Sequence, residues 1–167
     1  YPGAGVVNGK AYLVAGYAGA STAVNEEYDP IANTWTTRLA LPAANYGVTV
    51  VSFEGKIYSA GGDTSTTALW EYNPVTNAWT TRASMLSART TAGGGTIGGK
   101  IYVIGGLNGT ETNRNEEYDP ISNTWTSRAV ITTARYLMPA VTLGSKIYVP
   151  GGCTGTFLCT TSHLTVM

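Results

Sequence analysis

The sequence has little charge and only one histidine. Charged residues make up 12% of the 167 positions, about half the share that is usual in soluble domains, and 10 basic residues balance 10 acidic ones. This balance gives no basic surface for a nucleic acid or an anionic membrane. No apolar run approaches the roughly 20 residues of a membrane-spanning helix, and a hydrophobic content of 43% argues against disorder. Together with 21 glycines and abundant threonine, these features predict one β-rich domain over residues 1–167.

What the sequence does contain is an internal repeat. The string Lys-x-Tyr occurs four times, at spacings of 46, 44 and 46 residues, and it accounts for every lysine of the chain. A glycine pair follows each string, except that Ala15-Gly16 stands in the first copy. In three copies Glu-Tyr-Asp/Asn-Pro, Asn-x-Trp and an arginine then follow in that order. The expected repeats cover residues 1–42, 43–86, 87–132 and 133–167, and the last one is incomplete.

Each period has the pattern of four short β-strands. In the third repeat, residues 100–104 alternate weakly and stop at a glycine pair, and a third strand ends at residues 117–119. Pro120 then starts a tight turn that leads to a fourth strand at residues 124–128. A unit of four strands at this period is typical of a β-propeller blade.

The motifs resemble those of the kelch repeat, because a glycine pair precedes a spaced Tyr and Trp and no Gly-His or Trp-Asp pair occurs. The resemblance covers essentially the whole chain and implies an all-β fold of kelch-type blades, each of four antiparallel strands. It implies that the glycine pairs close the second strands and that the Tyr and Trp side chains pack between blades. The residues given these structural roles are Gly61, Gly62, Gly105, Gly106, Gly151, Gly152, Tyr28, Tyr72, Tyr118, Trp35, Trp79 and Trp125.

The resemblance also implies a loop face around the propeller axis that binds peptides or sugars, with an arginine near the first strand taking part. The candidate ligand-face residues are Asn45, Tyr46, Arg89, Arg135, Tyr136 and Trp70. Two interpretations stay open for the arginines: they tie down a loop, or they form a rim of charged and stacking side chains. Trp70 lies outside the repeat pattern, and it is either packed between blades or an exposed anchor.

Two cysteines, Cys153 and Cys159, lie six residues apart after the last glycine pair. We expect a local disulfide, because the second and third strands of a blade are antiparallel neighbours whose ends approach; two free buried thiols are the alternative. No metal site is expected, since His163 and the two cysteines give only three candidate ligands. Asn108 begins an Asn-Gly-Thr glycosylation sequon. These features and the low charge predict an extracellular or cell-surface location.

The sequence shows no catalytic constellation and no cofactor motif. No Gly-x-Ser-x-Gly elbow is present, and the glycines at 93–95 lack the Lys-Ser/Thr of a phosphate-binding loop. The adjacent glutamates at 26–27 and 116–117 point to opposite faces of their strands, so neither pair is an acid-base couple. We therefore predict a non-enzymatic interaction or scaffold module that binds protein or glycan. The alternatives are part of a carbohydrate-active kelch enzyme whose catalytic residues lie in other blades, or a self-assembling structural subunit.

The number of repeats predicts an incomplete arc or part of a larger propeller. Three blades and three quarters of a fourth would leave the apolar faces of the first and last blades uncovered. The arc belongs to a longer chain, or two copies form one closed ring, or the chain is a compact four-bladed form or a continuous assembly. The expected protein partners are accordingly other copies or further blades.

Overall fold

The computed structural model describes residues 1–63, 66–155, 158–159 and 164–166. All regular structure in this part of the chain is β-strand, and each sheet is antiparallel. Helices long and apolar enough to cross a membrane are absent from these residues. The all-β class and the four-stranded unit predicted from the repeat are confirmed.

Four sheets follow the four repeats, and we call them blades 1 to 4. Blade 1 consists of β1 (Gly3–Val7), β2 (Lys10–Tyr17), β3 (Ser21–Asp29) and β4 (Thr34–Thr37). Blade 2 consists of β5 (Thr49–Phe53), β6 (Lys56–Ala60), β7 (Leu69–Asn73) and β8 (Ala78–Arg82). Blade 3 consists of β9 (Gly93–Ile97), β10 (Lys100–Ile104), β13 (Asn115–Asp119) and β14 (Thr124–Arg128). Blade 4 consists of β15 (Val141–Leu143), β16 (Lys146–Pro150) and β19 (Leu164–Val166).

Two short hairpins lie in the loops between second and third strands. They are formed by β11 (Leu107–Asn108) with β12 (Thr110–Glu111) and by β17 (Cys153–Thr154) with β18 (Leu158–Cys159). All four Lys-x-Tyr strings begin second strands, as the spacing predicted. His163, the one histidine, lies outside the described residues.

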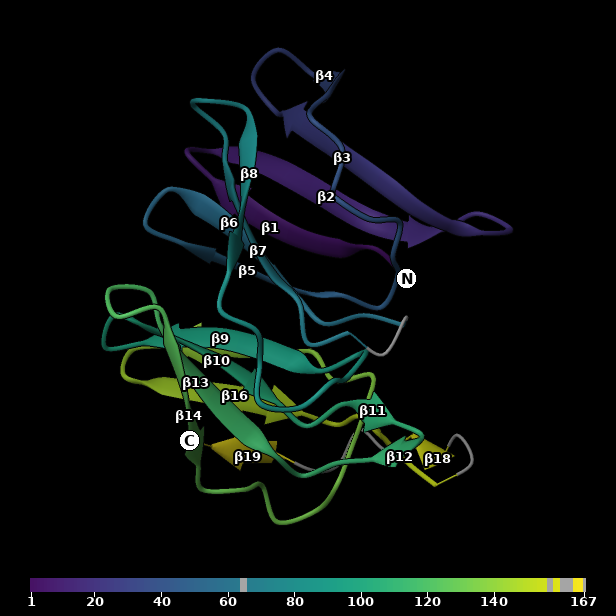
Figure 1. Cartoon of the computed structure of the whole chain (residues 1–167), viewed down its shortest axis with the longest axis vertical. Helices are drawn as coiled ribbons and strands as arrows, with labels where there is room; N and C mark the ends of the chain where they lie inside the picture. The colour runs from purple at the N-terminus through teal and green to yellow at the C-terminus, as the bar shows by residue number, and fades with distance from the viewer. Residues whose placement is uncertain (64–65, 156–157, 160–163, 167) are drawn as a thin grey trace.

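The blades follow one another as an arc. Figure 1 shows blade 1 at the top and blades 3 and 4 at the bottom of the molecule. The first strand of each blade contacts the first strand of the next: β1 contacts β5, β5 contacts β9, and β9 contacts β15. This succession agrees with the arrangement of blades that the resemblance implied.

Tight turns join the first and second strands of the blades. Asn8 and Gly9 have φ angles of 52° and 75°, and Glu54 and Gly55 have 47° and 72°. Positive φ at both central residues gives a turn whose twist matches that of the flanking strands. Asn-Gly fits this conformation well, and Glu54 adopts it at a greater steric cost.

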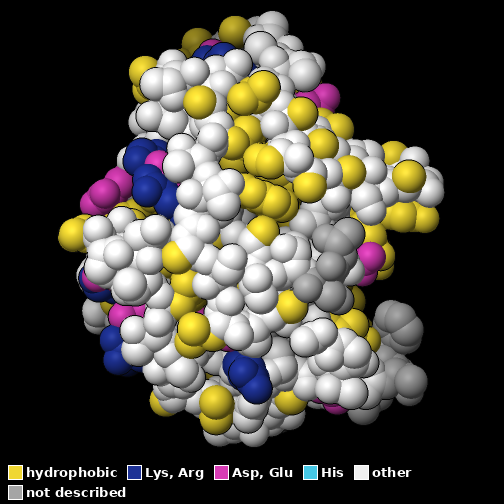
Figure 2. Space-filling view, in the orientation of Figure 1, with side chains coloured by type: hydrophobic (Ala, Val, Ile, Leu, Met, Phe, Trp, Pro, Cys, Tyr) yellow, Lys and Arg dark blue, Asp and Glu magenta, His cyan; other side chains and the backbone are white. Residues whose placement is uncertain are grey.

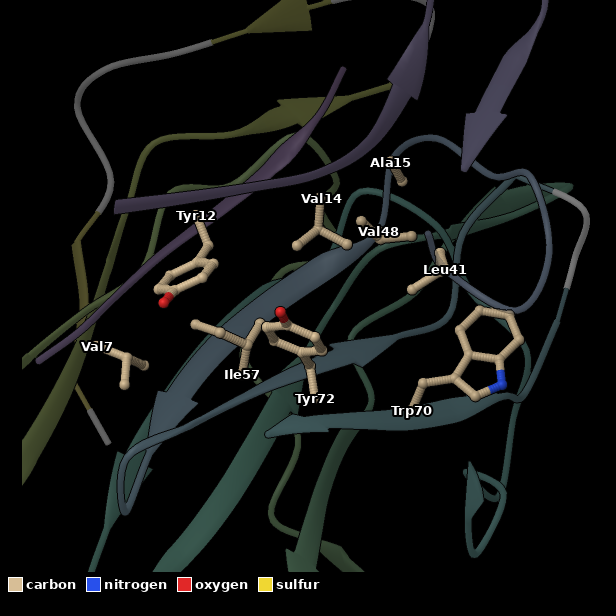
Figure 3. Close-up of a cluster of buried hydrophobic side chains, with 9 residues drawn as sticks. All are labelled: Val7, Tyr12, Val14, Ala15, Leu41, Val48, Ile57, Trp70 and Tyr72. Carbon is tan, nitrogen blue, oxygen red and sulfur yellow. The ribbon is translucent and has the colours of Figure 1, made fainter. Parts of the chain in front are cut away.

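The core lies between the blades. Figure 3 shows Tyr12 and Val14 pointing from β2 toward Ile57 and Tyr72 of blade 2, within one buried cluster. Trp70 belongs to that cluster and is only 9% exposed, so it packs between blades and is not a surface anchor. Blades 2 and 3 approach closely at Gly94, where a Cβ atom would lie 2.5 Å from the Thr49 side chain.

The glycine pairs end the second strands, as the resemblance implied. Gly61 and Gly105 have φ angles of 66° and 61°, which favour glycine. A Cβ atom on Gly61 would lie 2.2 Å from the carbonyl oxygen of Arg89 in the next repeat. The pair therefore allows both the turn and the contact with the segment that leads into the neighbouring blade.

The repeat tryptophans do not all have the implied role. Trp79 and Trp125 are half-buried and donate their indole N–H to carbonyl oxygens of the preceding blade. Trp35 is 54% exposed and contacts Tyr28 of its own blade, so its expected position between blades is wrong in this structure. The physical reason is that no described residue lies on that side of blade 1 to bury it.

Candidate functional site

Three of the candidate ligand-face residues are buried. Asn45 and Arg89 are each 1% exposed, and Arg135 is 6% exposed. Each donates a side-chain hydrogen bond to the first glycine carbonyl of a pair, 16 residues later in the chain. The distances from Asn45 Nδ2, Arg89 Nη1 and Arg135 Nη1 are 3.0, 3.2 and 3.3 Å. The rim interpretation is therefore wrong for the two arginines, and all three side chains tie down the loop at the glycine pair.

Arg89 has hydrogen-bond partners beyond the glycine carbonyl. Its guanidinium also donates to the carbonyl oxygen of Arg114 and pairs with the carboxylate of Glu116, which is 2% exposed. Burial lowers the pKa of Arg89 from its ordinary value, and the charge of Glu116 opposes that change. Ser87 donates its hydroxyl to the same carboxylate. These buried partners leave the guanidinium unavailable to a ligand.

A cavity of about 530 Å³ opens on the loop face next to these clamps. Figure 1 shows the N terminus, the β11–β12 hairpin and β18 on the same side of the molecule, at the right of the view. The cavity is lined by residues of all four repeats: Tyr1, Tyr46, Asp63, Thr90, Thr91, Leu107, Gly109, Thr110, Glu111, Tyr136, Leu137 and Gly155. Of the predicted ligand-face residues, only Tyr46 and Tyr136 line it.

Tyrosine rings gather at one end of this cavity. The ring centroids of Tyr46 and Tyr17 lie 5.2 Å apart in an edge-to-face arrangement, and those of Tyr46 and Tyr1 lie 6.5 Å apart. Tyr1 is 65% exposed and Tyr17 is 56% exposed. A hydrogen bond with Asp63 raises the pKa of Tyr46, so its hydroxyl stays protonated near neutral pH. The cluster offers aromatic faces beside a carboxylate.

The opposite end of the cavity is built by the two loop hairpins. The amide N–H of Gly155 donates to Oε1 of Glu111 over 3.0 Å, and the hydroxyl of Tyr136 donates to the Gly155 carbonyl oxygen over 3.4 Å. A disulfide joins Cys153 to Cys159 across the β17–β18 hairpin. These contacts connect the hairpins of blades 3 and 4 and fix one wall of the cavity.

A ladder of backbone hydrogen bonds joins successive blades beside the cavity. Gly47 donates its N–H to the carbonyl oxygen of Tyr1, Thr91 donates to Gly47, and Leu137 donates to Thr91. The three distances are 2.9, 2.7 and 2.9 Å, and the residues follow the repeat spacing of 46, 44 and 46. Sequence reasoning missed Tyr1, Thr91 and Leu137 as lining residues. The same spacing that aligned the lysines would have aligned these positions.

In each of the four-stranded blades, one buried glutamate accepts hydrogen bonds from a repeated tyrosine and a repeated arginine. Glu27 accepts hydrogen bonds from Lys10, Tyr12 and Arg38, at 2.8, 2.6 and 2.8 Å. Burial alone would raise the pKa of Glu27, but the three donors outweigh it, so the pKa is lowered. Glu71 has the equivalent donors Lys56, Tyr58 and Arg82.

In blade 3 the corresponding carboxylate is Glu117. Arg128 donates to both of its oxygens and Tyr102 donates to one, and these hydrogen bonds lower its pKa. Burial and the hydrogen bond to Glu117 raise the pKa of Tyr102 to about 12. Glu116 binds Arg89 instead, so the adjacent glutamates do serve different partners, as expected from opposite strand faces. Groups of three or more His, Cys, Asp or Glu suited to a metal do not occur among the described residues.

Comparisons with known proteins agree with this geometry. The family model of the Kelch motif matches residues 1–37, 44–86 and 88–129, which is more than half of the chain. A solved structure of YjhT is similar with a TM-score of 0.78 over 90% of this chain, at 18% sequence identity. The chain spans 57% of the length of that structure's chain, and at this identity the likeness concerns the fold alone. A search of curated proteins found no match.

Proposed function

The chain belongs to the kelch-repeat family, and we propose that it is a non-catalytic module that binds its ligand in the cavity of the loop face. One observation carries this proposal. Tyr1, Tyr46 and Tyr136 come from different repeats and meet the carboxylates of Asp63 and Glu111 around a space of about 530 Å³. A concave site with aromatic walls and a few fixed polar groups is the usual form of a binding pocket.

A glycan is the ligand class that fits this lining best. Tyrosine rings provide apolar faces for the C–H surface of a sugar, and their hydroxyls reach its polar groups. Carboxylates and threonine hydroxyls accept hydrogen bonds from sugar hydroxyls. Asp63, Glu111 and Thr110 supply such acceptors in the cavity.

A basic peptide is the second candidate, and the charge of the cavity supports it. Asp63 and Glu111 are acidic, and the part of the lining that the structure describes contains no lysine or arginine. A lysine or arginine side chain of a peptide would find a carboxylate there, and tyrosines are common anchors of protein interfaces. The two candidates differ in how salt affects their affinity, because only the binding of a charged peptide would weaken strongly as the salt concentration rises.

A binding screen followed by one substitution tests the proposal. The chain is applied to an array of neutral and acidic glycans and of basic peptides, and each hit is titrated by calorimetry. Tyr46→Ala should weaken binding by about tenfold or more, because it removes a cavity wall. Ile121→Ala, at a position 92% exposed in the turn between β13 and β14, should leave binding unchanged. Equal affinities for the two variants would refute the cavity as the binding site.

We also infer a non-enzymatic role and a location outside the cytoplasm. The buried carboxylates Glu27, Glu71 and Glu117 are each bound by an arginine and a tyrosine, which supports a structural use of these groups. The disulfide and the exposed Asn108 on β11 support the location. Secretion of the chain with a glycan on Asn108 would agree with this inference, whereas reduced cysteines in native protein would contradict it.

A further inference from the structure

Two carboxylates of the loop-face cavity lack the cationic partner that most acidic side chains of this chain have. Asp63 and Glu111 line the cavity, and neither forms an ion pair with a described residue. Six of the ten acidic side chains do form such pairs with lysine or arginine: Glu27, Asp29, Glu71, Glu116, Glu117 and Asp119. Two of the remaining four therefore lie in one cavity.

The cavity also contains no basic side chain that could neutralise these carboxylates. All ten lysines and arginines lie in the part of the chain that the structure describes, and none of them lines the cavity. On the face shown in Figure 2, basic side chains gather toward the left, and the right side, where Figure 1 places the loops, shows acidic side chains but no basic ones. The lining is therefore negative, although the chain as a whole has a formal net charge of zero.

Asp63 belongs to the blade in which a repeated ion pair has been replaced. Blade 3 holds the buried pair of Arg89 and Glu116. The repeat spacing places Asn45 and Trp70 at these two positions in blade 2. Asn45 keeps the hydrogen bond to the glycine pair but brings no positive charge next to Asp63.

Asn45 instead holds Asp63 and Tyr46 together. Its Oδ1 atom accepts hydrogen bonds from the amide N–H of Tyr46 over 2.8 Å and from that of Asp63 over 3.0 Å. The amide of Asp63 also donates to the Tyr46 carbonyl oxygen over 2.9 Å, and the Tyr46 hydroxyl donates to the Asp63 carboxylate. An arginine side chain has no acceptor and could not make the first two bonds. The ring and the carboxylate are therefore positioned before a ligand binds.

Asp63 is a better acceptor for a cationic ligand than Glu111. Glu111 already accepts a hydrogen bond from Gly155, and it shares a second pocket of about 290 Å³ with the exposed Arg114. Asp63 is bound by the neutral hydroxyl of Tyr46, and its blade has a blade of this chain on each side. The charge of Asp63 is accordingly the less compensated of the two.

We infer that the cavity selects a cationic glycan, an amino sugar whose ammonium group binds Asp63 beside the ring of Tyr46. This inference rests on the proposed function and names the class of sugar that the site takes. An ammonium group forms a charge-assisted hydrogen bond with a carboxylate, and the face of a tyrosine ring attracts a cation. The same ring provides an apolar face for the C–H surface of the sugar.

The hydroxyl groups of the lining favour a sugar over a lysine-containing peptide. The hydroxyls of Thr90 and Thr91 donate to backbone carbonyl oxygens, so their oxygens keep lone pairs that can accept hydrogen bonds from a ligand. Thr110 and Tyr136 bring further hydroxyls to the cavity. A sugar has hydroxyl donors for several of these acceptors, whereas a lysine side chain offers a single ammonium group.

Calorimetric titration of the chain with three short oligosaccharides tests the inference. The first is an oligomer of glucosamine, in a mildly acidic buffer that keeps its amines protonated. The second is the glucose oligomer of the same linkage, which has a hydroxyl in place of each amine, and the third is the N-acetylated oligomer, which keeps the nitrogen without the charge. The amino sugar should bind about fivefold more tightly than either neutral oligomer, and this preference should shrink in high salt.

Asp63→Asn should remove the preference for the amino sugar, because asparagine keeps the size of the side chain without its charge. Glu54→Gln is the matched control: it removes one negative charge in the exposed turn between β5 and β6 and should leave the preference unchanged. Thermal unfolding of both variants shows whether they are folded. The comparison of the three oligosaccharides on the unsubstituted chain does not depend on either variant.

The outcomes separate this inference from the proposed function. Equal affinity for the three oligosaccharides, a preference that persists in Asp63→Asn, or tighter binding of a lysine-rich peptide would overturn the inference. Binding of neutral glycans alone would overturn it as well, but the proposed function would stand because the cavity would still bind a sugar. Failure of every glycan on the array to bind would remove both.

Discussion

The indole N–H of Trp79 donates a 2.9 Å hydrogen bond to the carbonyl oxygen of Leu39 in the preceding blade. The amide N–H of Leu39 donates in turn to Oδ1 of Asn77 over 3.0 Å. The Asn and Trp side chains of this motif therefore bind the N–H and the C=O of one residue in the preceding blade. In the next repeat, Asn123 and Trp125 bind the N–H and the C=O of Ala83 in the same way. Asn77 has a φ of 49°, a conformation that asparagine tolerates better than most residues.

Replacing Trp79 by phenylalanine should lower the free energy of unfolding by about 1–2 kcal/mol, because the hydrogen bond and part of the ring contact are lost. Trp35→Phe is the matched control, since no described residue accepts its indole N–H and the side chain is 54% exposed. We expect a change below about 0.5 kcal/mol for the control. Urea denaturation of dilute protein measures the free energy of unfolding of both variants. Equal losses would show that the inter-blade hydrogen bond contributes nothing.

The buried carboxylates predict how stability depends on pH. The pKa values of Glu27, Glu71 and Glu117 are lowered in the folded protein, and hydrogen bonds from Lys100 and from the Ile121 amide lower the pKa of Asp119 to about 2. The unfolded chain therefore binds more protons than the folded chain in acid. Stability should be complete above the unfolded values near pH 4 and should fall as the pH decreases toward about 2. Denaturant unfolding at several pH values gives this curve.

Glu71→Gln tests whether these networks cause the acid sensitivity. Burial alone would raise the pKa of Glu71, and the bonds from Lys56, Tyr58 and Arg82 lower it. The variant should lose about 1–3 kcal/mol at pH 7, and the difference from the wild type should shrink as the pH falls. Glu54→Gln, in an exposed turn, serves as the control and should show the wild-type pH profile. A constant difference from pH 7 to pH 2 would contradict the role of the Glu71 charge.

The fold could be predicted from the sequence because the first three blades repeat the same local contacts. Tyr12 and Arg38 recur at one spacing because, in each of the first three blades, the equivalent side chains bind one buried glutamate. The second strands, the glycine pairs and the packing of Trp79 and Trp125 follow from that repetition. A regular spacing of this kind identifies an element and its position without knowledge of the arrangement in space.

The candidate site was harder to predict, because exposure is not encoded in the repeat. Arg89 and Arg135 occupy positions that suit a ligand rim, yet both are buried and donate to glycine carbonyl oxygens 16 residues later. Trp35 has the same motif as Trp79 but is exposed, since burial depends on a neighbouring blade. The cavity combines loops of different lengths, such as those carrying Asp63 and Glu111, and their juxtaposition requires the folded structure.

Alanine substitutions at Gly61 and Gly55 distinguish the cost of steric crowding from the cost of backbone strain. Both have positive φ, at 66° and 72°, so alanine at either position carries a similar conformational cost of about 1–2 kcal/mol. A Cβ atom on Gly61 would lie 2.2 Å from the Arg89 carbonyl oxygen, whereas one on Gly55 would meet nothing within 4 Å. Gly61→Ala should therefore cost about 1–3 kcal/mol more than Gly55→Ala. Thermal or urea unfolding compares them, and equal costs would mean that the loop at the glycine pair adjusts freely.

The bond between Cys153 and Cys159 predicts the chemical state of both residues. Alkylation of native protein without a reductant, followed by mass spectrometry, should modify neither cysteine. After reduction, alkylation should modify both, and the free energy of unfolding should fall by about 2 kcal/mol or less, because a loop this short constrains the unfolded chain weakly.

Reduction should act mainly on the cavity wall. The backbones of Cys153 and Tyr136 exchange hydrogen bonds of 2.8 and 3.1 Å, and Gly155 binds Glu111, so the disulfide hairpin supports the loops on which the site depends. We expect faster hydrogen exchange at these amides after reduction, with little change in the strands of blades 1 and 2. Uniformly faster exchange would show that the disulfide stabilises the whole arc. Modification of both thiols in unreduced native protein would exclude the bond and remove the main support for a location outside the cytoplasm.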